Sequence, residues 1–403
     1  MKKITRQEFI KSSLILGVSL PFISSFLVSC EDEQGVVLPK FETNFSGKVI
    51  VIGAGASGLC AGYLLQRHNI DFEIIEASST FGGRVKRATG FADFPIDLGA
   101  EWIHASPSIL ADIVDDPTKN SNIEFITYNP QEISAWNNGK LREHNYASNF
   151  YSEYKFKNTT WFGFFERYIV SEFVDKITYN QPIVEIDYSA NKVLVRSIDN
   201  TVYEADKVLV TVPIKILQGR TINFIPEMPV IKQDAINSIS MGDGIKVFIE
   251  FKKRFYPDIL AIGRLIETLS SSDKVFYDVA FRKDSNKNIF GLFAVQEKAS
   301  PYTDLNSDQE IVDKILVELD EIYDGKASAN YIKHLVQNWS KEPYIKGSYS
   351  ANGDGLTIDT IKQPLNNRVY FAGEALANNG SATVHGACED GFQAIKLILT
   401  SNT

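Results

Sequence analysis

The chain has 403 residues, which is enough for about two or three domains and a large core. Its 44% hydrophobic and 23% charged residues describe a globular protein, and they exclude both a long disordered chain and a polytopic membrane protein. A formal charge of -9 argues against a nucleic-acid-binding surface, so no nucleic acid partner is expected. Three cysteines are too few for a disulfide framework and lack metal-ligand spacing, so we expect no metal site.

The first thirty residues are typical of an export signal rather than of a folded domain. A basic head precedes Leu14–Val28, an apolar stretch that is too short and too broken to span a membrane comfortably. The run that ends at Cys30 resembles the bacterial lipobox, in which the cysteine becomes the lipid-bearing first residue of the mature chain. We therefore expect a lipoprotein signal peptide over residues 1–30, lipid attachment at Cys30 and a tether over residues 31–46.

A second export signal overlaps the basic head. Thr5–Lys11 resembles the twin-arginine motif, with Gln7 in place of the second arginine. That route carries folded, cofactor-loaded proteins. The expected location is the periplasmic or cell-surface face of a bacterial membrane, with a lipid anchor. An ordinary secretory signal with an incidental cysteine is the alternative.

After the tether, the chain opens with the βαβ pattern of a dinucleotide-binding fold. Lys48–Ile52 is a short β-rich run that ends in glycines, Ser57–Gln66 fits a helix, and Asp71–Ile75 is a second strand. The stretch between residues 106 and 180 is mixed and aromatic, with a helical pattern at Phe162–Lys176.

Strands and helices then alternate to the end of the chain. The strands expected are Ile183–Asp187, Lys192–Ser197, Val202–Val212, Gly244–Phe251, Val275–Phe281, Ile289–Val295 and Arg368–Phe371. Asp308–Tyr323 predicts an amphipathic helix, and a final helix is expected from about Thr383.

This alternation predicts an α/β protein, α+β overall, in which a Rossmann-like dinucleotide-binding domain is interleaved with a sheet-plus-helix domain. Two interleaved domains explain the pattern better than two consecutive ones. The expected ranges are 47–105, 181–225 and 335–403 for the first domain, and 106–180 and 226–334 for the second.

The turn after the first strand carries a chemical signature. Gly53–Gly58 obeys the G-x-G-x-x-G pattern, whose glycines allow a tight turn and close approach of the backbone to a pyrophosphate. Glu76, at the end of the second strand, stands where a carboxylate would bind the ribose hydroxyls of an adenosine. An intact 2′-hydroxyl predicts FAD or NAD rather than NADP.

A second turn distinguishes FAD from NAD. Phe81–Val85 contains a Gly-Gly-Arg turn and resembles the second signature of the flavin amine oxidase family. Further segments resemble that family in the family's own order: Asp97–His104, Val208–Pro213, Met241–Val247, Trp339, Gly347–Ser350, Phe371–Glu374 and Thr383–Ala387. Their pattern is closest to the polyamine oxidases, with the monoamine oxidases and lysine-specific histone demethylases as related groups. The resemblance implies that the first domain binds FAD and that the second is the substrate domain.

The resemblance also implies a set of FAD contacts. They are Gly53, Ala54, Gly55, Ser57, Gly58, Glu76, Ala77, Gly83, Arg84, Gly99, Ala100, Glu101, Trp102, Ile183, Glu374, Thr383 and Val384. Arg84 is expected to neutralise the pyrophosphate, Glu374 to bind the ribityl chain, and the backbone at Thr383 to face the flavin ring. Ser348 stands where the mitochondrial monoamine oxidases carry the cysteine that bonds to flavin, so non-covalent FAD is expected.

Three residues are expected to be catalytic, namely Lys246, Tyr349 and His104. In the family, the lysine that corresponds to Lys246 holds a water against flavin N5, whereas a snorkelling strand-end lysine is the structural alternative. Tyr349 keeps one wall of the family's aromatic amine cage, and Thr383 replaces the other. A histidine can orient or deprotonate an amine near neutral pH, and a purely structural role is the alternative for His104.

The substrate follows from what this segment lacks. Amino acid oxidases of the family place an arginine in the segment corresponding to Leu98–His104, because a substrate carboxylate needs a bidentate partner. Glu101 and His104 stand there instead, so a polyamine-like amine without a carboxylate is expected. The stretch between His104 and Asn180 has about half the length expected for the family's substrate lobe.

The function expected is therefore an FAD-dependent oxidoreductase. A primary or secondary amine loses a hydride to flavin N5 and becomes an imine, and O2 or another acceptor reoxidises the flavin, with H2O2 as the product from O2. Two alternatives stay open, a carbon-carbon desaturase and a non-catalytic FAD-binding surface lipoprotein. Peroxide release with a panel of amines distinguishes the three.

Overall fold

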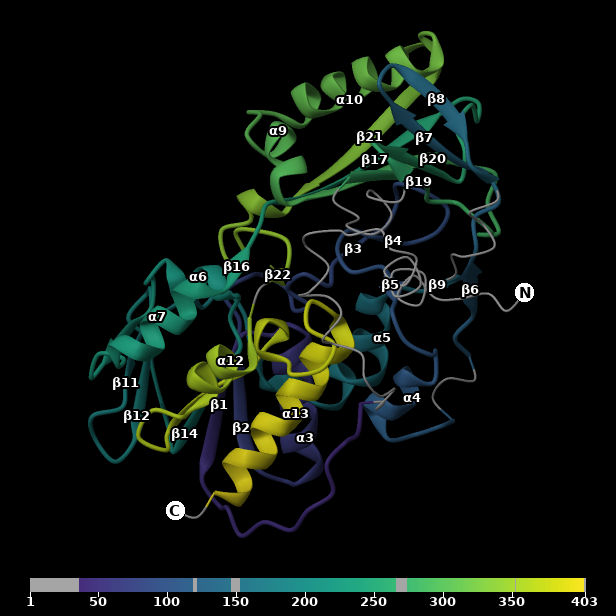
Figure 1. The fold of residues 1–403 in the computed structure, drawn as a ribbon. Coiled ribbons are helices and arrows are strands. Elements are labelled where there is room, and N and C mark those ends of the chain that lie inside the picture. Colours follow the sequence, from purple (N-terminus) through teal and green to yellow (C-terminus); the bar gives the residue numbers. More distant parts are fainter. Residues whose placement is uncertain (1–35, 119–121, 146–152, 266–273, 352, 402–403) are drawn as a thin grey trace.

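The computed structural model describes residues 36–118, 122–145, 153–265, 274–351 and 353–401. The expected signal peptide and its Cys30 lie outside these ranges, so both stay predictions. Within the described ranges, no helix has the length and apolarity that crossing a bilayer requires. Figure 1 shows two bodies, a sheet with helices in the lower part of the view and a second large sheet at the top.

The lower body is built on a five-stranded sheet in which all neighbouring strands are parallel. In spatial order its strands are β10 (Ile177–Thr178), β2 (Asp71–Ile75), β1 (Lys48–Ile52), β14 (Lys207–Val210) and β23 (Val369–Phe371). Parallel strands are covered on both faces, and accordingly Val49, Ile50 and Val51 are fully buried. The predicted βαβ opening is confirmed, because α3 (Ala56–Arg67) connects β1 to β2.

The C-terminal helix α13 (Val384–Thr400) packs along α3 (Figure 1). The two helices approach closely at Gly391, where a Cβ would stand 2.3 Å from the Ser57 carbonyl oxygen. Thr383 caps the helix, since its side chain accepts a hydrogen bond from the Gly386 N–H at 3.0 Å. The final helix predicted from Thr383 is confirmed.

A four-stranded sheet stands beside the parallel sheet. Its strands, in spatial order, are β13 (Val202–Ala205), β12 (Val193–Ser197), β11 (Ile183–Asp187) and β15 (Asn223–Ile225). Three helices complete this side of the molecule, α6 (Ile214–Gln218), α7 (Val230–Ser238) and α12 (Gly355–Lys362) (Figure 1).

The single strand predicted over Val202–Val212 is wrong. It is two strands, β13 in the four-stranded sheet and β14 in the parallel sheet, and Asp206 lies between them. The Asp206 carboxylate accepts a hydrogen bond from the Lys48 backbone N–H at 2.8 Å. The chain therefore changes sheets at a residue whose side chain binds β1.

The upper body is a seven-stranded sheet that is antiparallel except between β18 and β7. In spatial order its strands are β21 (Tyr331–Asn338), β17 (Gly244–Phe251), β20 (Asn288–Val295), β19 (Lys274–Asp278), β18 (Ile259–Ile262), β7 (Ile133–Asn137) and β8 (Lys140–Glu143). The helices over its outer face are α10 (Asp308–Tyr323) and the short α9 (Ser300–Thr303) and α11 (Lys326–Asn330) (Figure 1). The predicted amphipathic helix is confirmed, because Ile311, Ile315 and Leu319 of α10 are buried.

Short strands and helices connect the two bodies. A three-stranded sheet has the order β5 (Trp102–Ile103), β9 (Glu153–Phe156) and β6 (Phe125–Tyr128). Two strand pairs are β3 (Arg87–Ala88) with β4 (Ile96–Asp97), and β16 (Ser240–Met241) with β22 (Ser350–Ala351). Helices α4 (Ile109–Val114) and α5 (Trp161–Tyr168) contribute side chains to the core of the lower body.

The stretch between residues 106 and 180 differs most from the prediction. The helix expected over Phe162–Lys176 ends at Tyr168, and two 3₁₀ turns follow, η2 (Val170–Glu172) and η3 (Val174–Lys176). The same stretch supplies β6 to β9, of which β7 and β8 join the seven-stranded sheet. Ile133 of β7 lies opposite Ile259 of β18, so a partner distant in sequence stabilises this strand.

Strand pairing crosses the expected domain boundaries. β10, expected in the second domain, forms the edge of the parallel sheet, and the boundary at residue 335 falls inside β21. Residues 36–46, expected as part of a free tether, lie against the lower body instead. Val36 and Leu38 are buried, and the Val37 N–H donates to Glu389 at 3.0 Å. The prediction of a tether is therefore wrong for residues 36–46, because the apolar side chains of Val36 and Leu38 are buried against the folded body.

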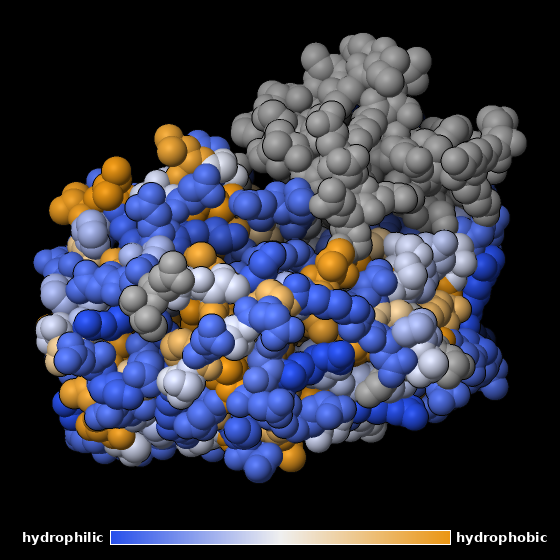
Figure 2. Space-filling view, turned by 90° about the horizontal axis from the view of Figure 1, so that it is seen from below, coloured by the Kyte–Doolittle hydropathy of each residue, from blue (hydrophilic) through white to orange (hydrophobic). Residues whose placement is uncertain are grey.

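The surface agrees with the composition of a globular protein. Figure 2 shows a face that is mostly hydrophilic, on which apolar side chains form small separate patches. Scattered exposed apolar side chains are usual for globular proteins. The candidate for a functional site is instead a cavity inside the molecule.

Candidate active site

A cavity of about 440 Å³ opens between the two bodies. The turns after β1, β2, β14 and β23 line it from the lower body, and the first residues of β17 and the last of β20 line it from the upper body. The carboxyl ends of parallel strands are where α/β sheets bind ligands. The cavity therefore occupies the position at which this fold holds a dinucleotide.

Most residues predicted at the site line this cavity. They are Gly53, Gly55, Ser57, Glu76, Ala77, Gly83, Arg84, Gly99, Ala100, Glu101, Trp102, His104, Ile183, Lys246, Tyr349, Glu374, Thr383 and Val384. Ala54 and Gly58 lie directly behind the lining. Ala54 is fully buried, and a Cβ on Gly58 would stand 2.0 Å from the Gly53 carbonyl oxygen. The structure thus brings these residues together from segments far apart in the sequence.

The glycine turn leaves room for a phosphate group. Gly53 has a φ of +104°, a conformation that favours glycine. A Cβ on Gly55 would meet nothing within 4 Å, so the cavity reaches the backbone at the start of α3. The buried Ser57 hydroxyl lines the cavity and has no hydrogen-bond partner among the described residues. An orphaned hydroxyl at a helix N-terminus fits a pyrophosphate oxygen.

Glu76 is held in place by the backbone. Its two carboxylate oxygens accept the Ala54 N–H at 2.7 Å and the Ser78 N–H at 2.8 Å. Each carboxylate oxygen has a second lone pair, so both can also accept ribose hydroxyls. The residue is buried and faces the cavity, as its predicted role requires.

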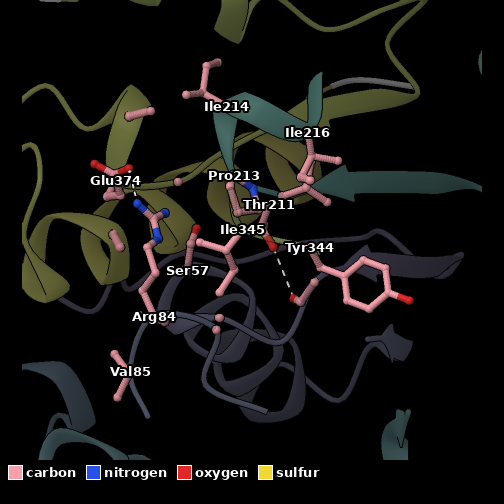
Figure 3. A pocket seen from close by; sticks show the side chains of 18 of the residues that line it. Ser57, Arg84, Val85, Thr211, Pro213, Ile214, Ile216, Tyr344, Ile345 and Glu374 are labelled. Atoms are coloured by element: carbon pink, nitrogen blue, oxygen red, sulfur yellow. Dashed lines mark hydrogen bonds and ion pairs between the residues drawn. The ribbon is translucent and has the colours of Figure 1, made fainter. Parts of the chain in front are cut away.

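Arg84 and Glu374 bind each other at one side of the cavity (Figure 3). Arg84 Nη1 donates to Glu374 Oε1 at 2.7 Å and to the Ser348 carbonyl at 3.0 Å. Ser350 Oγ donates to Glu374 Oε2 at 2.7 Å. Glu374 is therefore the counter-ion of Arg84, and the sequence did not predict that these two residues pair. The Arg84 contacts described here use Nη1, which leaves Nε and Nη2 for a bound anion.

Lys246, at the start of β17, is buried and donates all three of its N–H groups within the protein. The acceptors are the Asp97 carbonyl at 2.9 Å, the Gly99 carbonyl at 3.1 Å and Glu101 Oε2 at 2.6 Å. An ammonium has three donors. To hold a water, as predicted from the family, Lys246 must therefore give up one of these contacts.

Glu101 also differs from its predicted role. Its carboxylate binds two lysines, with Lys246 on Oε2 and Lys155 on Oε1, and Tyr277 Oη donates to Oε2 at 2.6 Å. The side chain thus faces an internal network rather than a cofactor. Lys155 and Tyr277 were missed from the sequence, because their segments carry no motif. The alternation of charged residues at Glu153 and Lys155 was the available signal.

Burial and charge determine the protonation of this cluster. Burial, together with the charge of the neighbouring Glu101, raises the pKa of Asp97 to about 8. Burial alone would raise the pKa of Glu101, but the ammonium groups of Lys155 and Lys246 hold it well below its usual range. Burial lowers the pKa of Lys246, and Glu101 offsets part of that effect. At neutral pH the network therefore contains a neutral Asp97 and an ionised Glu101.

His104 stands on the same cavity wall, next to an acid that the sequence analysis did not single out. Its Nδ1 lies 3.5 Å from Glu153 Oε2, and the His104 side chain is 41% exposed whereas that of Glu153 is 9% exposed. The β5–β9 register, with Trp102 opposite Lys155, brings these two residues together. Tyr349 lines the cavity from the segment before β22.

Comparison with known protein families agrees with this geometry. The profile of the family described as flavin containing amine oxidoreductase matches residues 168–399, and that of an NAD(P)-binding Rossmann-like domain matches residues 51–116. Polyamine oxidase 1 of Zea mays is 24% identical over 454 aligned positions, which cover 87% of this chain and 90% of that protein. Lysine-specific histone demethylase 2 of Homo sapiens is 26% identical over 451 positions, which cover 90% of this chain and 54% of that protein.

Solved structures of putrescine oxidase share the fold. The wild type bound to putrescine gives a TM-score of 0.70 at 16% identity, over 88% of this chain and 99% of that chain. A triple mutant redesigned in cofactor binding gives 0.72 at 16% identity, over 89% and 99%. The glycine turn, Glu76 and the Ser57 hydroxyl fit FAD, and Ser348 offers no thiol for a covalent bond, so the FAD is non-covalent. The chain therefore belongs to the flavin containing amine oxidoreductase family, as its motifs predicted.

Proposed function

We propose that this chain is an FAD-dependent amine oxidase whose substrate is a primary or secondary amine without an α-carboxylate. The observation that carries the proposal is that one cavity joins the dinucleotide turn to Lys246, Tyr349 and His104. Relatives named polyamine oxidase and histone demethylase support an amine substrate. In the reaction the amine loses a hydride and a proton to become an imine, and O2 gains both to become H2O2.

The charges at the cavity argue against a substrate carboxylate. Among the described lining residues, Arg84 and Lys246 are the arginine and lysine side chains. Lys246 is paired with Glu101, and the Arg84 donors that Glu374 leaves open are the ones assigned to the FAD pyrophosphate. A substrate carboxylate binds best to an arginine whose guanidinium is free for two parallel hydrogen bonds. The buried acid Glu153 beside His104 instead favours an ammonium at that wall.

His104 is placed to remove the proton from a bound ammonium. Amines are mostly protonated at neutral pH, and only the neutral amine can release a hydride. With Nδ1 facing Glu153, the Nε2 atom is left to take the substrate proton. The Glu153 carboxylate beside Nδ1 orients the ring, so that Nε2 is directed away from it.

When bound, the flavin supplies the hydride acceptor and passes the electrons to O2. The N-terminus of α13 lines the cavity at Thr383 and Val384, where its partial positive charge stabilises negative charge that develops nearby. Trp102, Phe293 and Tyr349 supply aromatic walls that exclude water.

Peroxide release with matched amine pairs tests the proposal. Putrescine and ornithine differ only by a carboxylate, as do cadaverine and lysine. The purified yellow protein should release H2O2 with the two diamines and not with the two amino acids. Yellow protein that releases no peroxide with any amine would overturn the proposal. That result favours the carbon-carbon desaturase or the non-catalytic FAD-binding lipoprotein.

We also propose that the protein is exported and anchored to a membrane through lipid on Cys30. The support is the basic head, the apolar stretch and the lipobox-like run among the first thirty residues. An anchored enzyme would act on amines outside the cytoplasm.

A further inference from the structure

Two buried lysines share one carboxylate beside the cavity. Glu101 Oε2 accepts a hydrogen bond from Lys246 Nζ at 2.6 Å, and Glu101 Oε1 pairs with Lys155 Nζ. We propose that Lys155 is a positioning residue that acts through Glu101 to set where the Lys246 ammonium stands at the cavity wall. The proposal deepens the proposed function and rests on it for the catalytic use of Lys246.

Lys155 is enclosed so that its ammonium can serve only inside the protein. It lies on β9, opposite Trp102 of β5, and is 2% exposed. Its Nζ is 4.8 Å from the centre of the Tyr128 ring, 5.1 Å from that of Tyr277 and 5.2 Å from that of Trp102. Three aromatic faces stabilise a cation without competing for its hydrogen bonds. The Lys155 ammonium therefore pairs with Glu101 Oε1 inside the protein, where it is shielded from water and substrate.

The position of Lys246 depends on Lys155 because both lysines bind the same carboxylate, that of Glu101. Two of the acceptors of Lys246, the carbonyls of Asp97 and Gly99, belong to the backbone, whereas the third is the side chain of Glu101. A carboxylate held on one oxygen only can rotate. Lys155 on Oε1 and Tyr277 on Oε2 together fix its rotation, so that Oε2 faces Lys246. Without Lys155, Oε1 would be a buried acceptor with no cation, and Lys246 could move to bind both oxygens.

Charge adds a second link between the two lysines. The titratable groups that face the cluster from the packed elements are Asp97, Glu101, Tyr128, Lys155, Tyr277, Asp278 and Lys283. Burial lowers the pKa of Lys246, and the like charge of Lys155 lowers it further. Removing Lys155 should therefore raise the pKa of Lys246, so that its ammonium persists to higher pH.

The first test needs no amine. Protein reduced with dithionite regains its yellow colour in aerated buffer, and the rate is followed from pH 6 to 11, a window spanning roughly the range in which a buried lysine titrates. We expect the rate to fall at alkaline pH in the wild type, and this fall to be absent in Lys246→Met. Lys155→Met should move the fall upward by about one pH unit, whereas Lys155→Arg should keep it in place. Lys155→Gln, which keeps a donor and loses the charge, should show the same shift and provides a second variant if Lys155→Met does not fold.

Lys232→Met is the matched control. Lys232 is also buried, and its ammonium donates to the carbonyls of Thr360, Ile361 and Gln363, away from this cluster. Its loss should leave the pH dependence unchanged. Three results would overturn the proposal. The reoxidation rate of the wild type does not fall at alkaline pH, the fall occurs at the same pH in Lys155→Met, or the fall shifts by the same amount in Lys232→Met.

The second test measures thermal unfolding of the FAD-loaded protein. Each single variant, Lys155→Met or Lys246→Met, leaves Glu101 with one ammonium partner. The double variant leaves only the Tyr277 hydroxyl, and a buried carboxylate without a cation is costly. The double variant should therefore lower the unfolding midpoint by more than the sum of the single variants, and adding Glu101→Gln should remove the excess. Additive changes overturn the shared-carboxylate argument.

The two proposals can fail separately. Wild-type protein that oxidises no amine contradicts the proposed function. In that case a shifted alkaline fall and non-additive unfolding would still support the role of Lys155 toward Lys246. If the wild type oxidises amines but the alkaline fall of the reoxidation rate does not shift in Lys155→Met, the proposed function stands and the positioning role of Lys155 is rejected.

Discussion

Glu76 offers a sharp test of the cofactor site, because its contacts are short and few. Its oxygens accept the backbone N–H groups of Ala54 and Ser78 at 2.7 and 2.8 Å. Glu76→Gln keeps the shape of the side chain but replaces one oxygen with an NH₂ group. One buried N–H then loses its acceptor, at a cost of about 1–3 kcal/mol in the free energy of unfolding.

FAD binding should weaken as well, because the ribose hydroxyls lose an ionised acceptor. A hydrogen bond to a charged group contributes about 1.5–3 kcal/mol, so the Kd for FAD should rise roughly 10- to 100-fold. The Kd is measured by titrating flavin-free protein with FAD and monitoring the quenching of flavin fluorescence. The free energy of unfolding is measured by chemical denaturation.

Glu73→Gln is the matched control, because Glu73 lies on β2, which Glu76 directly follows, and binds Lys48 at 3.2 Å and Thr178 at 2.8 Å. This variant should change stability without changing the Kd. Equal FAD affinity in Glu76→Gln and wild type, or equal weakening in Glu73→Gln, would refute the assignment of Glu76 to the ribose.

The remaining predictions concern the reaction, a helix cap, pH and location. Lys246→Met should hold FAD yet lose roughly 10²-fold in turnover, as measured by steady-state peroxide release. Thr383→Ala should lower the free energy of unfolding by about 1 kcal/mol through loss of the α13 cap, and Thr383→Ser should restore it; thermal denaturation measures both. Because burial raises the pKa of Asp97 from its unfolded value of about 4 to about 8, the folded state binds more protons between these values, and stability falls as pH rises. Asp97→Asn should remove that fall when denaturation is compared at pH 5 and pH 8.5, and a slope equal to wild type contradicts it. Cys30→Ser should abolish fatty-acid incorporation and move the protein from the membrane to the soluble fraction; membrane association without incorporated lipid contradicts the anchor.

The cofactor end of the site could be predicted from the sequence because its determinants are local. The turn at Gly53–Gly58 follows a strand directly, and the acid at the end of the next strand reaches it across neighbouring strands. Phosphate and ribose binding depend on backbone conformation and on one carboxylate, and both appear in a short motif. The same holds for the capped start of α13 at Thr383, where a single hydroxyl decides where the helix begins.

Secondary structure could be predicted for elements whose own residues show a clear periodicity. The prediction failed for strands whose boundaries depend on the strands they pair with. Val202–Val212 reads as one strand, yet the two halves pair in different sheets. The mixed stretch after residue 106 forms strands because the upper sheet and β5 provide edges for them. A strand is stabilised by its neighbours, and no local pattern names those neighbours.

The reacting end of the site was decided by the tertiary structure. Lys246 was identified from its motif, but its partner Glu101 is 145 positions away, and Tyr277 is 176 positions from the same carboxylate. Lys155 carries no motif at all and reaches Glu101 only because β9 pairs with β5. The sequence determined which residues can ionise. The folded structure determined which of them share a buried charge, because burial and distance, rather than residue type, set the strength of that coupling.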